Sequence, residues 1–143
     1  YDNLVMFGEL YHLGKKNAVL RANELLERFN LTEAAKRPIK TYSGGMRRRL
    51  DLAASLIVKP KVLFLDEPTT GLDPNQLVEI RNVIKNVGKN KTVFLSTHIM
   101  QEVEAICDRV IIINKGNLVA DDTLENLKKD GGTLEEIFRK LTN

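Results

Sequence analysis

The sequence predicts an α/β fold in which a block of helices comes first and a parallel sheet follows. The first observation is that apolar residues in residues 1–58 recur at steps of three and four, which is typical of amphipathic helices. The second is a change of period after Pro60, where short continuous apolar runs alternate with helical stretches. Strand, helix, strand, helix and strand in that order, with 110–113 as the third strand, favour a parallel sheet whose strands are connected by helices.

The helical block contains one clear apolar stripe, formed by Ala18, Ala22, Leu25, Leu26 and Phe29. Arg21, Glu24 and Glu27 fall between these positions and are predicted on the opposite side of the helix. Pro38 then breaks the pattern, and Ser43 stands where a helix N-cap is expected. The helix that follows has an apolar side made of Leu50, Ala53, Leu56 and Ile57.

Two apolar runs, 62–65 and 92–96, predict strands of the sheet that are buried on both faces. Between them, Asp73 and Pro74 are an N-cap and a first-turn proline, so we expect a helix that starts there and stops at Gly88.

The remaining residues predict a further helix, a hairpin and a helical tail. The helix is expected to turn Met100, Val103 and Ile106 inward. Apolar runs at 110–113 and 118–120 flank a hairpin-like turn, and residues 133–136 match a helix capping box.

Composition and charge narrow the class of protein. The chain has 143 residues, 43% hydrophobic residues and a net charge of +3, which suits one globular domain. Basic residues are scattered apart from Arg47–Arg49, so a nucleic-acid partner is not expected, and we expect those arginines to form a solvated or acid-paired helix face. The single cysteine, Cys107, is predicted to be a buried structural thiol. No apolar run approaches the roughly 18 residues that span a bilayer, so any membrane attachment is expected through a partner.

The strongest chemical feature is a pair of adjacent carboxylates, Asp66 and Glu67, directly after a predicted strand. Open α/β sheets bind ligands at the carboxyl ends of their strands, so both acids are candidate site residues. One can hold a hydrated Mg²⁺ while the other orients an attacking water. The alternative is an ordinary polar turn, because Asp-Glu-Pro is also good turn chemistry.

Two further features lie where a phosphate could bind. Gly44 and Gly45 follow the Ser43 cap, and such a helix start lets backbone N–H groups approach an anion. The alternative is an ordinary helix start that the two glycines make more flexible. His98 follows the second strand, on the sheet edge expected for the carboxylates, although a histidine at a strand end is more often structural.

These motifs, in this order and spacing, resemble the ATP-binding-cassette family over essentially the whole chain. Residues 42–46 look like its signature motif, with Tyr for the usual Leu and Met for the usual Gln. Residues 62–67 resemble the Walker B strand with its catalytic glutamate. Residues 71–73 resemble the D-loop, and His98 resembles the switch histidine.

The resemblance implies a P-loop NTPase-like parallel sheet preceded by an α-helical signature subdomain, with ATP and Mg²⁺ as cofactors. Residues 1–58 would be the helical subdomain, 59–122 a partial RecA-like α/β core and 123–143 a C-terminal helical tail.

The resemblance also implies residue roles. Asp66 would hold Mg²⁺ through water, Glu67 would act as general base or water-positioning group, and His98 would contact the γ-phosphate. Asp73 would communicate across a head-to-tail dimer interface. The γ-phosphate of ATP held on the opposite subunit would be bound by Ser43, Gly44 and Gly45.

The subfamily and partners follow from the same resemblance. The signature region and the tail look like the daunorubicin-resistance type of bacterial exporter ATPase, whereas residues 75–115 look closer to ATPases linked to gliding motility. A lineage between the two and a chimaeric chain are both compatible with this mixture. The implied partners are a second nucleotide-binding subunit and a separate transmembrane permease, with the chain in the cytoplasm and peripheral on the inner face of the cell membrane.

The residues contain no Gly-x-x-x-x-Gly-Lys-Ser/Thr phosphate loop. We therefore expect this chain to be the C-terminal portion of an ATPase subunit and to be inactive alone. In the family the phosphate-loop strand lies between the 92–96 and 110–113 strands, so we expect exposed strand edges that favour self-association, rearrangement or marginal stability. Alternatives are a non-catalytic module that offers its signature face to a partner's ATP, and part of a soluble non-transport ATPase.

Overall fold

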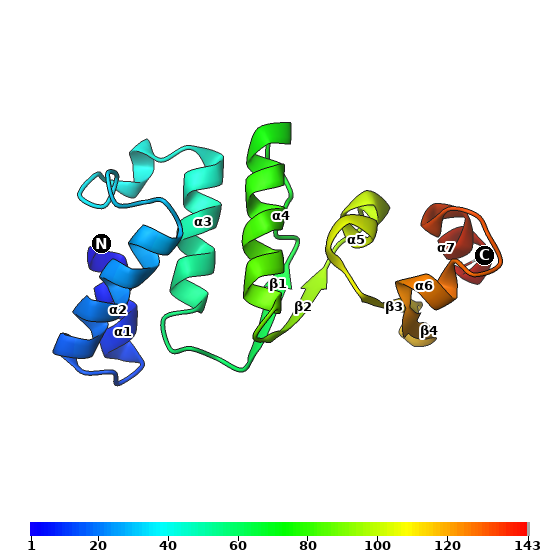
Figure 1. Cartoon of the computed structure of the whole chain (residues 1–143), viewed down its shortest axis with the longest axis horizontal. Helices are drawn as coiled ribbons and strands as arrows, with labels where there is room; N and C mark the ends of the chain where they lie inside the picture. The colour runs from blue at the N-terminus through cyan, green and yellow to red at the C-terminus, as the bar shows by residue number, and fades with distance from the viewer. Residues whose placement is uncertain (143) are drawn as a thin grey trace. The chain divides into compact units, whose positions relative to one another are not determined.

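The computed structural model describes residues 1–142 and divides into two compact units (Figure 1). The first unit runs from Tyr1 to Ser96 and the second begins at Thr97. The predicted division at residues 58 and 122 stays a prediction.

The first unit begins with helices, as predicted for residues 1–58. They are α1 (Asp2–Leu10), α2 (Lys15–Arg28), the short 3₁₀ helix η1 (Ile39–Thr41) and α3 (Gly44–Ser55). Their core is apolar and closely packed, and its fully buried members include Leu4, Ala18, Ala22, Leu25, Phe29, Leu31, Leu56 and Ile57. The predicted apolar stripe of α2 is therefore confirmed.

Arg21 departs from its predicted place, because its side chain is buried rather than opposite the core. Its Nη2 donates to the carbonyl oxygen of Leu56 at 3.0 Å and its Nε to that of Ile57 at 3.3 Å. These carbonyls follow the last turn of α3, where helical partners run out. Arg21 supplies the donor for the Ile57 carbonyl and a second donor for the Leu56 carbonyl, which also accepts from the Lys59 N–H at 3.1 Å. Its ion pair with exposed Glu24 (2.5 Å) balances the charge.

The sheet of the first unit is a parallel pair joined by a helix. Strand β1 (Val62–Asp66) pairs with β2 (Thr92–Ser96) in a register that sets Asp66 opposite Ser96. Helix α4 (Pro74–Gly88) connects them and contacts β2. The predicted start of α4 is confirmed, since the Asp73 carboxylate accepts from the N–H groups of Asn75 and Gln76.

The prediction that these strands are buried on both faces is wrong. Val62, Phe64 and Phe94 are 44%, 75% and 44% exposed, whereas Leu63 between them is buried. The Phe64 and Phe94 rings stack on the exposed face, with centroids 5.1 Å apart. Apolar residues at successive positions predict two apolar faces, but burial requires an element to cover each face, and here only the Leu63 face is covered.

The second unit contains a helix, a hairpin and two further helices. They are α5 (Met100–Ile106), β3 (Arg109–Asn114), β4 (Asn117–Thr123), α6 (Leu124–Leu127) and α7 (Leu134–Thr142). Lys115 and Gly116 have φ angles of 49° and 80°, so the predicted turn is a tight hairpin turn. The core of this unit consists of Val103, Val110, Ile112 and Leu134, with Met100 and Phe138 packed against it.

The third predicted strand, 110–113, does not extend the parallel pair within residues 1–142. Strand β3 is hydrogen-bonded to β4 in an antiparallel register, and the described strands form two separate two-stranded sheets. A parallel sheet needs a hydrogen-bonded neighbour for each strand, and no such strand joins β3 to β1 or β2 in the described part of the chain.

Cys107 is half-buried against this core rather than fully enclosed. Burial raises the pKa of its thiol above 9.0, and the nearby carboxylates of Asp108 and Glu102 raise it further. The neutral thiol is therefore favoured, which suits the structural role predicted for it.

Candidate functional site

The carboxylate pair lies where the two parallel strands of the first unit end together. Asp66 is the last residue of β1 and Glu67 begins the turn that follows. Ser96, the last residue of β2, donates its hydroxyl to Asp66 Oδ1. The Glu67 N–H donates to the Ser96 carbonyl at 3.1 Å and lies 3.2 Å from its hydroxyl oxygen. Ser96 was not among the predicted site residues, although its place at the end of the next strand could have identified it.

Glu67 adopts a backbone conformation that is uncommon for a residue other than glycine. Its φ angle is +44°, in the left-handed region. Its carboxylate accepts a hydrogen bond from the Thr70 hydroxyl at 3.1 Å. Such strained backbone costs of order 1–3 kcal/mol and persists where its surroundings hold it, which is common at functional sites.

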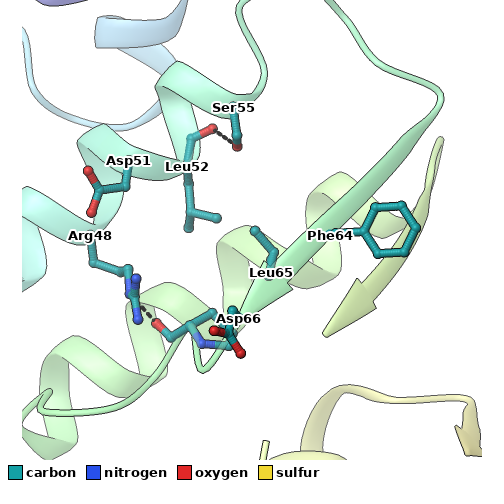
Figure 2. A pocket seen from close by; sticks show the side chains of 8 residues that line it. Arg48, Asp51, Leu52, Ser55, Phe64, Leu65 and Asp66 are labelled. Carbon is teal, nitrogen blue, oxygen red and sulfur yellow. Dashed lines mark hydrogen bonds between the residues drawn. The ribbon is translucent and has the colours of Figure 1, made fainter. Parts of the chain in front are cut away.

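Arg48 is the residue of α3 that holds this turn (Figure 2). Its Nε donates to the Pro68 carbonyl at 2.7 Å, and its Nη2 donates to the Glu67 carbonyl. A small pocket lies between α3 and the strand. It is lined from the helix by Arg48, Asp51, Leu52 and Ser55, and from β1 and its turn by Phe64, Leu65, Asp66 and Pro68.

The expectation of a solvated or acid-paired arginine face is correct for Arg47, which is exposed, and for part of Arg49. Arg49 is 3.7 Å from Glu79, but its Nη1 donates to the Phe29 carbonyl at 3.3 Å. Arg47 donates to the Tyr42 carbonyl at 3.2 Å. All three arginines therefore donate to backbone carbonyls of this chain. Periodicity does not reveal this role for Arg48 and Arg49, because their acceptors lie 19 or 20 residues away in sequence.

The residues predicted to bind phosphate lie at the N-terminus of helix α3. Ser43 is its N-cap, and its hydroxyl oxygen accepts from the Met46 N–H at 3.2 Å. Gly44 is exposed at the helix start. Gly45 is buried, and a Cβ there would lie 2.8 Å from Gln76 Cγ. The packing of α3 on α4 thus requires glycine at position 45, whether or not an anion binds there.

Asp73 and His98 occupy different environments. Asp73 caps α4, with its Oδ1 accepting from Gln76 N–H at 2.9 Å, directly after a turn where Gly71 has a φ of +76°. His98 is exposed and lies in the second unit, between β2 and α5. Its predicted place beside the carboxylates stays a prediction.

The carboxylates suit a hard cation that retains its water. Mg²⁺ is usually bound through one or two carboxylates, with water and substrate phosphates completing its six ligands. The described residues hold no cluster of three or more metal-ligating side chains, and Asp66 is exposed beside the Ser96 hydroxyl. An exposed carboxylate beside a hydroxyl fits an Mg²⁺ ion that arrives bound to a nucleotide better than it fits a metal ion enclosed by protein ligands alone.

The solved structures that this fold resembles define its class. A chain described as "Structure of ATP binding subunit of ABC transporter" matches 99% of this chain and 61% of its own length, with a TM-score of 0.80 and 26% identity. A "putative metal-chelate type ABC transporter" in an inward-facing conformation matches 88% and 52%, with a TM-score of 0.79 and 27% identity. The chain therefore has the α/β P-loop-type fold of ATP-binding-cassette ATPase domains.

Sequence comparison agrees with the fold. The family model described as "ABC transporter" matches residues 2–70. The chain belongs to the ATP-binding-cassette transporter family, among its ATP-binding proteins, as the motifs predicted.

Several curated relatives of the chain are named as resistance ATP-binding proteins. It is 49% identical over 132 residues to "Daunorubicin resistance ATP-binding protein DrrA3" of Streptomyces coeruleorubidus, covering 92% of this chain and 42% of that protein. It is 47% identical to "Doxorubicin resistance ATP-binding protein DrrA" of Mycobacterium tuberculosis, covering 92% and 40%. "Linearmycin resistance ATP-binding protein LnrL" of Bacillus subtilis is 42% identical, with 89% and 41% covered. The chain thus spans about two fifths of the length of these relatives.

Proposed function

We propose that this chain provides the Walker B, signature and D-loop elements of the ATP-binding subunit of a bacterial exporter. The complete subunit would hydrolyse ATP at a head-to-tail dimer interface to drive transport. One observation carries the proposal: the Asp66–Glu67 pair ends β1 and is fixed on both sides, by Ser96 of β2 and by Arg48 of the signature helix. A polar turn without a function would not need such support.

The chemistry assigned to this site is general-base hydrolysis of a phosphoanhydride. Glu67 is the group that would orient and deprotonate the attacking water, because its carboxylate follows the strand end directly. Asp66 would hold the Mg²⁺ of Mg·ATP through water, and that ion would neutralise charge on the phosphates. His98 would contact the γ-phosphate.

The signature residues would act on nucleotide held by a second subunit. The exposed N-terminus of α3, at Ser43 and Gly44, presents N–H groups and the positive end of a helix dipole. Gly45 keeps this end seated on α4. Asp73, which caps α4, would relay contacts across the same interface.

The 143 residues by themselves are proposed to be inactive. They contain no Gly-x-x-x-x-Gly-Lys-Ser/Thr motif, so the backbone nest and lysine that hold the β- and γ-phosphates are not supplied by them. Calorimetric titration of Mg·ATP into the chain, from micromolar to millimolar, tests this. We expect no detectable heat of binding, whereas clear micromolar binding would contradict the proposal.

Activity is tested in a hybrid subunit in which this chain replaces the matching segment of the 49%-identical relative. We expect Mg²⁺-dependent ATP hydrolysis that Glu67→Gln lowers by at least roughly a hundredfold, because the amide cannot take a proton from water. Glu27→Gln, on the exposed surface of α2, is the control and should leave the rate unchanged. A folded hybrid whose rate is indifferent to Glu67→Gln would favour the non-catalytic module instead.

The proposed partners are a second ATP-binding subunit and a separate membrane permease. In the described residues, no helix is both long enough and apolar enough to cross a bilayer. The similarity to ATP-binding proteins of resistance exporters supports our proposal of a cytoplasmic subunit held at the inner face of the membrane by the permease. Affinity capture from bacterial membranes with the hybrid should recover an integral membrane protein; recovery of nucleic acid or ribosomes alone would favour a non-transport ATPase.

A further inference from the structure

We infer that Arg48 is a positioning residue for Glu67, an inference that rests on the catalytic role proposed for that glutamate. The two residues are separated by 19 positions in sequence and belong to different elements, α3 and the turn after β1. The guanidinium contacts two successive carbonyl oxygens of that turn, those of Glu67 and Pro68.

The contact matters because of the backbone it restrains. With φ at +44°, Glu67 is in a conformation that its own Cβ disfavours. Its N–H is held by Ser96 and its carbonyl by Arg48, so both peptide planes that define this conformation are fixed from outside the turn. The direction of the Cα–Cβ bond follows from those planes, and so therefore does the direction of the carboxylate.

The guanidinium is suited to this task by its shape and charge. Its planar fork donates through two nitrogen atoms at once, and charged donors form the stronger hydrogen bonds. A lysine donates from a single nitrogen without the planar fork, and a glutamine has a shorter, neutral amide. Ser43 and Gly44 lie at the N-terminus of α3, the helix that contains Arg48. Arg48 therefore also links this helix, with its signature residues, to the Glu67 turn.

Arg47 is a matched control on the same helix. Its Nε donates to the Tyr42 carbonyl at 3.2 Å and its Nη2 lies 3.5 Å from the Lys40 carbonyl, both ahead of α3 and away from the turn. An Arg47→Gln substitution removes the same charge and the same type of hydrogen bond without touching Glu67.

The first test is made by nuclear magnetic resonance on the nucleotide-free hybrid subunit and needs no activity. The HN–Hα and one-bond Cα–Hα couplings of Glu67 together report whether its φ is positive. We expect a positive φ in the wild type and in Arg47→Gln, loss of it in Arg48→Gln, and an intermediate value in Arg48→Lys. A folded Arg48→Gln hybrid with wild-type couplings at Glu67 would overturn the inference. So would unfolding of both Arg48 variants, because Arg48 would then be a general structural residue.

The second test uses the hybrid subunit and separates positioning from binding. Arg48→Gln should lower kcat roughly tenfold to a hundredfold while KM for ATP changes less than about twofold, because a displaced base slows the chemical step only. Arg48→Lys should recover part of that loss. An equal fall in kcat for Arg47→Gln, or a change confined to KM, would overturn the inference. A wild-type hybrid without ATPase activity would contradict the proposed function and leave the coupling measurement as the decisive one.

Discussion

Arginine side chains in the first unit donate to backbone carbonyls that lie far away in the sequence. Arg21 binds the carbonyls that follow α3, and Arg48 binds the turn after β1. Arg49 reaches the carbonyl that follows α2. A carbonyl at the end of a helix or strand has no partner within its own element, so a long cationic side chain from a neighbouring element is an efficient donor for it.

Replacing Arg21 by methionine should destabilise the chain by about 2–4 kcal/mol. The substitution keeps most of the side-chain volume but leaves the Ile57 carbonyl without its donor in a buried position, and it removes one of the two donors to the Leu56 carbonyl. Urea denaturation followed by circular dichroism measures the change. Arg28→Met, on the exposed end of α2, should shift the free energy of unfolding by less than about 0.5 kcal/mol. Equal effects of the two substitutions would show that the Arg21 contacts carry no stability.

At the scale of elements, helix ends are closed by polar side chains that are local in sequence. Ser43, Asp73 and Thr123 cap α3, α4 and α6. In front of α7 the capping box is reciprocal: the Thr133 N–H donates to Glu136 Oε2 at 2.9 Å, and the Glu136 N–H donates to Thr133 Oγ1 at 3.2 Å. These contacts set where each helix begins, and hence which residues present their N–H groups.

Thr133→Ala should weaken α7 by about 1 kcal/mol, because the first-turn N–H groups lose an acceptor. Hydrogen exchange of the α7 amides is the measurement, and their protection should fall by roughly fivefold. Thr142→Ala, at the other end of α7, should leave the first-turn amides unchanged. Unaltered exchange in Thr133→Ala would mean that tertiary packing alone holds the helix start.

Glu104 links three helices of the second unit and should make its stability depend on pH. The Lys128 ammonium, at 2.8 Å, and then the Leu134 N–H hold the pKa of the Glu104 carboxyl below its ordinary value of 4.5. A pKa lowered by folding stabilises the folded state above the unfolded pKa, and this contribution is lost as pH falls through the folded pKa.

We therefore expect the second unit to lose stability as pH drops below about 4.5, and Glu104→Gln to flatten that part of the curve. Denaturant midpoints measured between pH 3 and pH 7 test this. Glu125→Gln, exposed on α6, is the matched control. An acid slope that Glu104→Gln leaves unchanged would assign the dependence to other carboxyls.

At the scale of the whole molecule, apolar surface and strand edges are left uncovered. Phe64 and Phe94 stack on the open face of the β1–β2 pair, and Ile113 and Leu118 are 65% and 64% exposed on the β3–β4 hairpin. Each described sheet has only two strands, so every strand has an unpaired edge. Open edges beside apolar faces favour association with another chain.

We expect the 143-residue chain to self-associate at micromolar concentration, as sedimentation velocity would show. Phe64→Lys should reduce the associated fraction severalfold by placing charge on the open face. Val78→Lys, on the exposed side of α4, adds the same charge elsewhere and should have little effect. A monodisperse, cooperatively unfolding monomer in the wild type would contradict the expectation.

The secondary structure and the motifs could be predicted because their causes are local. Periodicity located α2, and the Asp73–Pro74 pair located the start of α4. Residues 114–117 indicated the hairpin turn, and residues 133–136 the capping box. Each of these signals depends on a few neighbouring residues, so it can be recognised in the sequence before the fold is known.

What the sequence by itself determined is therefore the order and type of the elements, the family and the carboxylate pair at the end of β1. Tertiary structure alone decided that Arg21 is buried, that Arg48 and Ser96 hold the Glu67 turn, and that one face of the β1–β2 sheet is open. The physical reason is range: caps, turns and periodicity act between near neighbours, whereas burial and long side-chain hydrogen bonds depend on which distant segments come into contact.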